Sequence, residues 1–279
     1  MAQVRLRVRC RRHAEHCWAR CREAPFWAVP VPDVGGLWLA VWMEHPGEPV
    51  HWDGAVNAWR ISGSVFRMGR REWLTEAGWH QAYDDGVRTV IDLRNPSEHG
   101  LRETDPAVSP VVLAAFDVVH APTEDPDHPE FKELCSPYLN DPACYAANAR
   151  LFPDKLVAVF KAVAAAPAGV VIHCSAGRDR SGMVAAMLQD LTGAPDHEIV
   201  SGYQAAMRAI NERHRMVGPP HKHERYLDEG ALLPLLETRG GGALEFVRRL
   251  DTTNYLLRHG LTAAELAAIR SRLASRMTM

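Results

Sequence analysis

A cysteine and an arginine lie six positions apart in one loop of this sequence, at a spacing suited to chemistry on phosphate. Residues 170–182 read Val-Val-Ile-His-Cys-Ser-Ala-Gly-Arg-Asp-Arg-Ser-Gly, with Cys174 at the start of the loop and Arg180 at its end. A cysteine thiolate can attack phosphorus and form a phosphocysteine intermediate. The planar guanidinium of an arginine can bind two phosphoryl oxygens at once, and this contact matters most in the transition state.

The loop connects an apolar run typical of a buried strand to a segment with helical periodicity. Met183, Met187 and Leu191 share one face of the helix expected over residues 181–192. A loop that enters a helix N-terminus directs unpaired backbone N–H groups into one hollow, where the helix dipole adds partial positive charge. Such a hollow binds a phosphate dianion and also stabilises a thiolate. The candidate phosphate-binding residues are Ser175, Ala176, Gly177, Arg178 and Ser181.

Three residues of this segment have types that suit supporting roles. Gly177 allows a tight curl or a positive φ angle in the loop. The Ser181 hydroxyl could hydrogen-bond the Cys174 sulfur and help it leave when water attacks the intermediate. His173 is expected to orient the loop backbone rather than to move protons.

Residues 173–182 resemble the signature of the protein tyrosine phosphatase superfamily, which reads His-Cys, five residues, Arg, then Ser or Thr. The loop is similar to that of the tyrosine/serine phosphatase branch, whose pattern is Ala-Gly-Lys-Asp-Arg; here Arg178 stands in place of the lysine. A looser similarity extends over residues 52–274. The resemblance implies a cysteine-dependent hydrolase that acts on phosphotyrosine proteins, and also on phosphoserine or phosphothreonine proteins, without a metal or cofactor.

The leaving oxygen needs a proton, and two aspartates are the main candidates to supply it. By the resemblance, the acidic residue inside the loop is the general acid, which makes Asp179 the first candidate; the alternative is that Asp179 only hydrogen-bonds loop amides. Asp92 is the second candidate, because it ends an apolar strand and open α/β sheets place ligands beyond such ends. Asp125 and Asp127 lie on a proline-rich acidic loop, for which a solvated connection is the simpler interpretation.

The apolar runs predict an α/β fold with a central, mostly parallel sheet flanked by helices. Arg94 and Glu98, which follow the strand expected over residues 88–94, are interpreted as a structural ion pair that braces the loop. Arg67 ends another strand and is a candidate wall of the active site. A helical insert over residues 131–150, in a lid-like region near residues 120–150, could close over the site.

Local signals predict several further boundaries. Three polar residues are expected to cap helix N-termini, namely Thr75, Asp154 and Asp196. Thr262 and Glu265 form a capping-box pattern. Residues 111–119 read as strand, residues 214–225 are expected to break a helix, and the glycines at 240–242 are expected to form a joint.

The first 50 residues differ from the rest of the chain. They contain seven arginines and no lysine, and no helix or strand period is sustained. We expect a poorly structured extension over residues 1–50 and a catalytic domain over residues 51–279. Cys10, Cys17 and Cys21 lie near histidines but fit no ordinary zinc-ligand spacing. Our hypothesis is that translation starts at Met43.

The composition limits the classes of function. The chain has 279 residues, of which 47% are hydrophobic and 24% charged, as in a single globular catalytic domain. Its formal net charge of -2 argues against nucleic-acid binding through bulk charge, and no run of eighteen apolar residues predicts a membrane span. A nucleophilic cysteine needs a reduced thiol, which favours the cytoplasm, although secretion without a recognisable signal peptide is compatible with the sequence. Arginine outnumbers lysine 28 to 4, which we interpret as the coding bias of a GC-rich bacterial genome.

Three other functions could use a loop of this kind. A phosphoinositide phosphatase is favoured by Arg178 beside Arg180, because the extra charge could bind a second phosphate. A phosphate-binding module would show little turnover and form no covalent intermediate at Cys174. A sulfur-transfer enzyme also places a cysteine at a strand-to-helix loop, but Arg180 directly before Ser181 argues against it.

Overall fold

The computed structural model describes residues 47–135, 139–220 and 223–274. The extension expected over residues 1–50 lies almost entirely outside this range, as do the proposed start at Met43 and the cysteines Cys10, Cys17 and Cys21. The last residues of that segment are described, and they include the short strand β1 (Glu48–Pro49), which pairs with the next strand.

A six-stranded mixed sheet organises the described residues. In spatial order its strands are β1, β2 (Trp59–Ser62), β3 (Val65–Met68), β6 (Gly169–His173), β4 (Val87–Asp92) and β5 (Asp117–His120). Strands β3, β6, β4 and β5 run parallel to one another, whereas β1, β2 and β3 are joined as antiparallel neighbours. The predicted α/β fold with a mostly parallel sheet is therefore confirmed.

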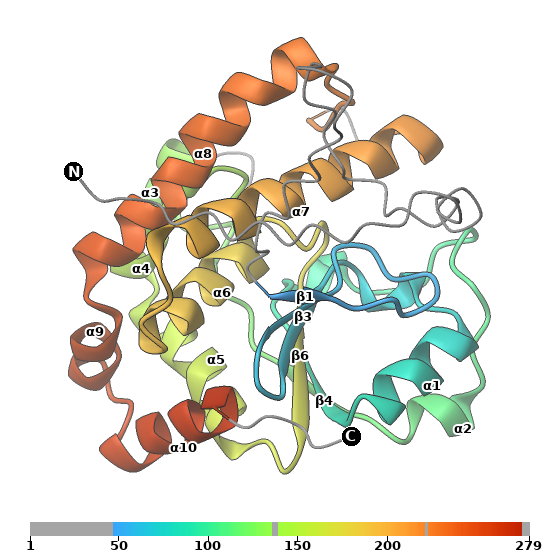
Figure 1. Cartoon of the computed structure of the whole chain (residues 1–279), viewed down its shortest axis with the longest axis horizontal. Coiled ribbons are helices and arrows are strands. Elements are labelled where there is room, and N and C mark those ends of the chain that lie inside the picture. Colours follow the sequence, from blue (N-terminus) through green and yellow to red (C-terminus); the bar gives the residue numbers. More distant parts are fainter. Residues whose placement is uncertain (1–46, 136–138, 221–222, 275–279) are drawn as a thin grey trace, which may run out of the picture. The chain divides into compact units, whose positions relative to one another are not determined.

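Helices and short 3-10 turns surround this sheet (Figure 1). The helices are α1 (Glu76–Asp84), α2 (Pro110–Leu113), α3 (Pro129–Cys135), α4 (Tyr145–Leu151), α5 (Pro153–Ala165), α6 (Arg180–Leu191), α7 (Asp196–Val217), α8 (Glu229–Leu250), α9 (Thr252–Arg258) and α10 (Ala263–Ala274). The 3-10 turns are η2 (Arg71–Trp73), η3 (Pro96–Glu98) and η4 (Pro142–Cys144). Among the described helices, none is both long enough and apolar enough to cross a membrane.

The central strand β6 is buried on both faces, as its unbroken apolar run predicts. Val170 and Ile172 pack into one core cluster with α4 to α10, and Val171 packs into a second cluster with α1. Figure 1 shows the corresponding layers, with α5 to α10 on one side of the sheet and α1 and α2 on the other. Packing on both faces fixes the end of β6, and therefore fixes where the following loop begins.

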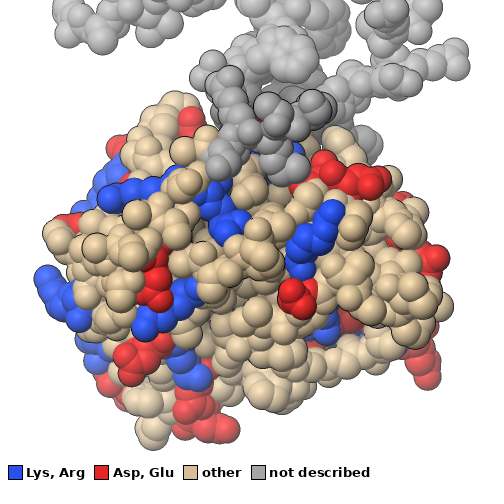
Figure 2. All heavy atoms as spheres, turned by 90° about the horizontal axis from the view of Figure 1, so that it is seen from below, with Lys and Arg blue, Asp and Glu red and all other residues tan. Residues whose placement is uncertain are grey.

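The surface of the described part carries mixed charge. Figure 2 shows Lys and Arg side chains interspersed with Asp and Glu side chains on one face, among a larger area of uncharged residues. This mixture agrees with the net charge of -2 and gives that face no broad region of one sign.

Two of the predicted helix starts are confirmed by their hydrogen bonds. The Thr75 side chain accepts a hydrogen bond from the Gly78 N–H and caps α1. At the start of α10, the Glu265 N–H donates to the Thr262 hydroxyl oxygen while the Thr262 N–H donates to the Glu265 carboxylate, which completes the capping box. The predicted helix over residues 181–192 is also present, as α6.

Two predicted caps and the first part of one predicted strand are wrong, and a proline lies at or before the start of each helix concerned. Asp154 lies inside the first turn of α5, because Pro153 takes the first helical position, where its fixed φ is favourable. Asp196 is likewise the first residue of α7, after Pro195. Residues 111–113 belong to α2, which begins at Pro110, whereas residues 117–119 of the predicted strand are confirmed as part of β5.

The expected breaks at residues 214–225 and 240–242 also differ from the structure. Helix α7 continues to Val217 and ends at Gly218, whose φ is 79°. Helix α8 runs unbroken through all three glycines. Gly240 has a packing reason to be glycine, because a Cβ there would lie 3.0 Å from the Val200 side chain of α7. Gly240 therefore serves the close approach of two helices, and the three glycines do not form a joint.

This packing yields a test of the α7–α8 interface. We expect Gly240→Leu to lower the free energy of unfolding by about 1–3 kcal/mol, because the side chain must enter an occupied space. The matched variant Gly241→Leu, where a Cβ meets nothing within 4 Å, should be neutral or stabilise by up to about 1 kcal/mol through helix propensity. Urea unfolding followed by circular dichroism measures both values, and equal effects would contradict the interpretation.

Candidate active site

Cys174 follows directly after β6, at the end of the sheet where the parallel strands β3, β6 and β4 all finish. Helix α6 begins at Arg180, so the loop between them spans six residues of backbone from Cys174 to Asp179. Open α/β sheets bind ligands beyond the carboxyl ends of their strands, and this loop lies there.

Contacts from Asn57 and from the end of β3 hold the loop backbone. Gly177 has a φ of 70°, and a Cβ there would lie 2.6 Å from the Gly69 nitrogen, so this position needs glycine as predicted. The Asn57 side-chain amide donates to the Ala176 carbonyl at 2.8 Å, and an Arg67 Nη donates to the Gly177 carbonyl at 2.6 Å. Arg67 is therefore a brace behind the loop and does not line the cavity at Cys174.

The carbonyl groups of the loop are thus engaged, while its N–H groups are not. Within the described part of the chain, no protein group accepts a hydrogen bond from the backbone N–H groups of residues 175–179. Unpaired N–H groups in a loop before a helix form a site for an anion. This is the arrangement that the sequence predicts for the residues Ser175 to Arg178.

Cys174 opens into a cavity of about 380 Å³. Its side chain is buried, and its Sγ lies 3.4 Å from the Ser181 hydroxyl oxygen, which is within hydrogen-bond distance for sulfur. Ser175, Ala176, Asp179 and Arg180 line the same cavity, whereas Gly177, Arg178 and Ser181 do not. A group bound in this cavity can contact both the Cys174 sulfur and the Arg180 guanidinium.

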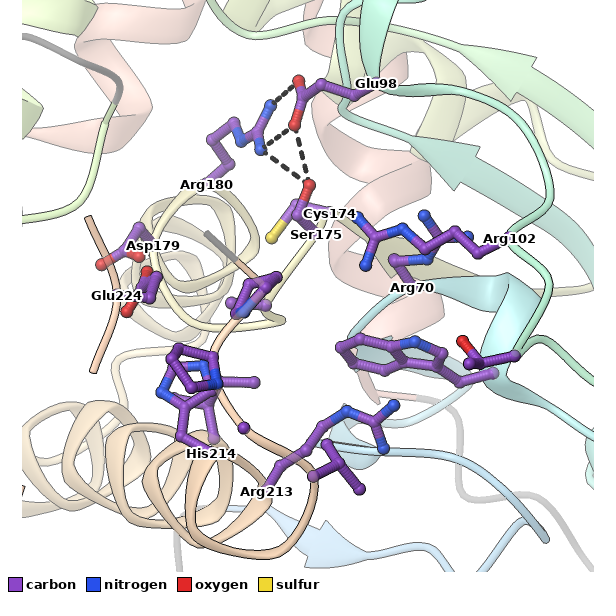
Figure 3. A pocket seen from close by; sticks show the side chains of 18 of the residues that line it. Arg70, Glu98, Arg102, Cys174, Ser175, Asp179, Arg180, Arg213, His214 and Glu224 are labelled. Atoms are coloured by element: carbon purple, nitrogen blue, oxygen red, sulfur yellow. Dashed lines mark hydrogen bonds and ion pairs between the residues drawn. The ribbon is translucent and has the colours of Figure 1, made fainter. Parts of the chain in front are cut away.

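The Arg180 guanidinium is held by Glu98 (Figure 3). Its two Nη atoms donate to the two Glu98 carboxylate oxygens at 2.5 and 2.7 Å, and the Ser175 hydroxyl donates to Glu98 at 2.7 Å. Burial by itself would raise the pKa of Glu98, but the hydrogen bonds and charge of Arg180 lower it to about 2. The Glu98 carboxylate therefore occupies the guanidinium edge that would bind phosphoryl oxygens.

The predicted ion pair between Arg94 and Glu98 is absent from the described contacts. Arg94 donates instead to both carboxylate oxygens of Asp92, at 2.8 and 2.9 Å, and to Glu72. The physical reason is position: η3 turns the Glu98 carboxylate toward Arg180, where it balances a buried positive charge.

Asp92 is fully buried and does not line the cavity. Besides Arg94, it lies 3.4 Å from the Nε2 of His173, whose Nδ1 lies 3.4 Å from the Cys174 carbonyl oxygen. Burial by itself would raise the pKa of Asp92, but hydrogen bonds from Arg94 and His173 hold it far below its usual range. Asp92 thus orients His173 and the start of the loop, and His173 contacts the loop backbone as predicted.

Asp92 also belongs to a group of residues with metal-binding side chains. Ligand atoms of Asp92, His99 and His120 lie within 4.8 Å of one another, the one such group among the described residues. Both Asp92 oxygens already accept hydrogen bonds from Arg94, whose charge disfavours a nearby cation. The site of Cys174 itself contains no such group among the described residues.

Asp179 reaches the cavity from the end of the loop, and both of its carboxylate oxygens are engaged. Oδ1 accepts a hydrogen bond from the Tyr203 hydroxyl at 2.9 Å, and Oδ2 accepts one from the Arg178 Nε at 2.9 Å. Arg178 is buried and also pairs with Glu224 at 2.9 Å. It therefore points away from the phosphate hollow, and the charge that favoured a second phosphate there is already neutralised.

The tyrosines Tyr145 and Tyr203 support Asp179 from the helices around it. The Tyr145 hydroxyl donates to the Asp179 carbonyl at 3.0 Å, and Tyr145 comes from the helical insert. Sequence patterns did not predict these contacts, because both tyrosines read only as apolar positions of helices. Asp127, by contrast, pairs with Lys132 at the surface, and neither Asp125 nor Asp127 lines the cavity.

Glu124 is a site residue that the sequence did not predict. It is buried next to the exposed Asp127 loop, and its Oε1 lies 3.5 Å from an Arg180 Nη. Its Oε2 has no hydrogen-bond partner among the described residues. Burial raises the pKa of the Glu124 carboxyl, against the lowering effect of Arg180. Arg180 is thus held between two carboxyl groups, one in the cavity and one behind it.

The two carboxyl groups predict opposite dependences of stability on pH. Glu98 has a lowered folded-state pKa, so its stabilising effect is present above the unfolded pKa of about 4.5 and is lost as pH falls toward 2. Glu124 has a raised folded-state pKa, so its effect is present below about pH 4.5 and is lost as pH rises through the folded pKa. As pH rises, the free energy of unfolding of Glu124→Gln should increase relative to that of wild type. As pH falls below 4.5, Glu98→Gln should lose less free energy of unfolding than wild type does. Urea unfolding between pH 2.5 and pH 8, values chosen to span these windows, measures this, and curves parallel to wild type would contradict the assignment.

Comparisons with known proteins agree with this site. A model described as the tyrosine phosphatase family matches residues 58–275. A protein named tyrosine-protein phosphatase from Nostoc commune is 35% identical over 203 residues, which are 71% of this chain and 62% of that protein. The chain therefore spans 62% of the length of this curated relative.

Solved structures with lower similarity were also found. TpbA from P. aeruginosa is 16% identical with a TM-score of 0.35, and the alignment covers 78% of this chain and 98% of TpbA. The core catalytic domain of the PP-IP phosphatase SIW14 from S. cerevisiae is 15% identical with a TM-score of 0.33, covering 75% of this chain and 96% of that domain. The family match over residues 58–275 contains strands β2 to β6 and the loop with Cys174 and Arg180, and the chain belongs to the tyrosine phosphatase family.

Proposed function

We propose that this chain hydrolyses phosphotyrosine in proteins, and also phosphoserine or phosphothreonine, through a phosphocysteine on Cys174. The observation that carries the proposal is that the Cys174 thiol and the Arg180 guanidinium line one cavity, beside loop N–H groups that have no protein acceptor in the described chain. Membership of the tyrosine phosphatase family supports the same reaction. The catalytic domain extends over residues 51–279, and its reduced thiol suits the cytoplasm.

In the first step the substrate phosphoryl group takes the place of Glu98 at the Arg180 guanidinium. The Cys174 thiolate attacks phosphorus, the P–S bond forms and the bond to the tyrosyl oxygen breaks. Asp179 gives its proton to that oxygen as it leaves. The loop N–H groups and Arg180 stabilise the charge on the equatorial oxygens.

In the second step a water molecule attacks the phosphocysteine. Asp179, now a carboxylate, takes a proton from this water, the P–S bond breaks and Cys174 leaves as a thiolate. The Ser181 hydroxyl, 3.4 Å from the sulfur, stabilises the leaving thiolate by a hydrogen bond. Inorganic phosphate is released and the enzyme returns to its starting state without a metal or cofactor.

Asp179 is the better supported of the two acid candidates. It lines the cavity with Cys174, whereas Asp92 is buried outside the cavity and bound by Arg94. Tyr203 and Arg178 fix the direction of the Asp179 carboxyl group. We therefore propose Asp179 as the general acid and Asp92 as a positioning residue that acts through His173.

Cys174 as the nucleophile and Arg180 as the phosphate-binding guanidinium can be tested by substitution. We expect Cys174→Ser to lower kcat on phosphotyrosine peptides by at least about 10³-fold, because the nucleophile is lost. Arg180→Lys keeps the charge but loses the two-point contact, and should cost about 10²–10³-fold. Phosphate release is measured with phosphotyrosine, phosphoserine and phosphothreonine peptides and with phosphoinositides, in the presence of a chelator.

Cys144→Ser is the matched control, because this cysteine is partly buried and lies outside the cavity. It should retain wild-type activity. Activity that survives in Cys174→Ser would contradict the cysteine mechanism. A wild type that binds phosphate analogues without releasing phosphate would favour a binding module, and a persulfide on Cys174 would favour sulfur transfer.

Asp179 as the general acid can be tested with two substrates whose leaving groups differ in their need for a proton. We expect Asp179→Asn to lower kcat/KM about 10²-fold or more for phenyl phosphate, whose leaving group needs a proton, and much less for p-nitrophenyl phosphate. Asp92→Asn should reduce both rates by a similar factor, because it acts on loop geometry. An equal loss for both substrates in Asp179→Asn would show that Asp179 is not the acid.

A further inference from the structure

A second group of positive charges lies in the cavity of Cys174. Arg70, Arg102 and Arg213 line it together with Trp73. They come from three separate segments, namely the residue directly before η2, the loop after η3, and α7. Figure 3 shows the three arginines on one side of the cavity, opposite Asp179, His214 and Glu224. Residues this far apart in sequence meet here only because of the fold.

Arg70 is neutralised by its surroundings. Its guanidinium donates to the buried Asp105 carboxylate at 2.6 Å and to the Gly100 carbonyl at 3.1 Å, and its Nε lies 3.6 Å from Glu72. Asp105 also accepts a hydrogen bond from the Arg102 backbone N–H, so it fixes the loop that carries Arg102. Arg70 is therefore a structural member of the group.

Arg102 and Arg213 differ from Arg70, because neither guanidinium forms an ion pair with another described residue. Arg213 is partly buried and stacks on the Trp73 ring at 3.8 Å, which orients its planar group without neutralising it. Burial lowers the pKa of Arg213, and the charges of Arg102 and Arg70 lower it further against the opposite effect of Asp105. Both positive charges thus line one cavity without a carboxylate paired to either of them among the described residues, and an anion bound in the cavity could pair with them.

We propose that Arg102 and Arg213 form a second anion subsite, which binds a further phosphate group of a substrate whose reacting phosphate lies on the Cys174 loop. The inference rests on the proposed function and names its substrate class: peptides with a second phosphorylated residue close to the phosphotyrosine. A phosphate dianion suits two guanidinium groups better than a single carboxylate does, because each guanidinium can donate two hydrogen bonds to the phosphate oxygens. The cavity of about 380 Å³ is in the range of ligand sites and larger than one phosphoryl group needs.

The charge on the other walls favours a peptide over a phosphoinositide headgroup. Asp179 and Glu224 line the opposite side of the cavity, so a compact ring with phosphates around it would face carboxylates. An extended peptide can place its second phosphate on the arginine side alone. The apolar residues Ile210, Val217 and Pro219 line the same cavity and could contact the peptide between its two phosphates.

The test uses two peptides that differ only in a serine or phosphoserine two residues after the phosphotyrosine. We expect the wild-type full chain to show about tenfold higher kcat/KM for the doubly phosphorylated peptide, as charge-assisted hydrogen bonds to the second phosphate would give. In Arg102→Gln and Arg213→Gln this ratio should fall toward one. Arg208→Gln is the matched control, because Arg208 lies on the same helix but pairs with Glu229 outside the cavity.

Binding of the same peptides to Cys174→Ser, measured by calorimetry, separates the subsite from turnover. A wild type that hydrolyses neither peptide would overturn the proposed function, while the affinity ratio would still decide the subsite. Equal affinity for the two peptides, or a ratio unchanged in both arginine variants, would overturn the subsite. A stronger preference for vesicles containing phosphorylated phosphatidylinositol than for the doubly phosphorylated peptide would overturn the peptide assignment.

Discussion

The site depends on the close contact between the backbone of Gly177 and the backbone at the end of β3. At Gly177 the chain has a positive φ of 70° and passes so near Gly69 and Met68 that no side chain fits between them. Because β3 and β6 are parallel neighbours, this contact anchors the loop to the sheet on the side away from the cavity. The N–H groups of the loop can then face the cavity, and Cys174 and Arg180 are brought together although they are six residues apart.

Charge pairing around the loop follows from burial. Cations and carboxylates with little access to water must be balanced by neighbours, and three of the buried arginines near the loop show this. Each of these arginines forms ion pairs with two carboxyl groups. The pairs are Arg180 with Glu98 and Glu124, Arg94 with Asp92 and Glu72, and Arg178 with Asp179 and Glu224. Glu98 differs from the other carboxylates because it lines the cavity and binds both Nη atoms of Arg180, the guanidinium that would bind a phosphoryl group. This makes Glu98 the partner that a phosphoryl group would replace.

The helical insert contributes to the site through its interior face. Phe131, Leu139 and Tyr145 are buried in the main core cluster, and the Tyr145 hydroxyl reaches the loop at Asp179. The described part of the insert is therefore tied to the same core as α5 and α6. Its predicted action as a lid stays a prediction, whereas its support of Asp179 is a contact in the structure.

Local sequence patterns predict the features that depend on few neighbouring residues. The spacing of Cys174, Gly177 and Arg180, the apolar run of β6 and the caps of α1 and α10 all act over one or two turns of backbone, so local patterns predict them. Which charges meet depends on how the distant segments pack. The Glu98 carboxylate binds Arg180 rather than Arg94, and Arg178 pairs with Glu224. Arg102 and Arg213 line one cavity with Trp73. The pair of Glu98 with Arg180 joins residues 82 positions apart, and the pair of Arg178 with Glu224 joins residues 46 positions apart. Whether such residues meet depends on strand order and helix packing, which no local pattern contains. Local patterns also did not predict that α8 is a continuous helix through three glycines. The helix packs against α7 at Gly240, where a larger residue would meet the Val200 side chain, and this contact is set by tertiary packing.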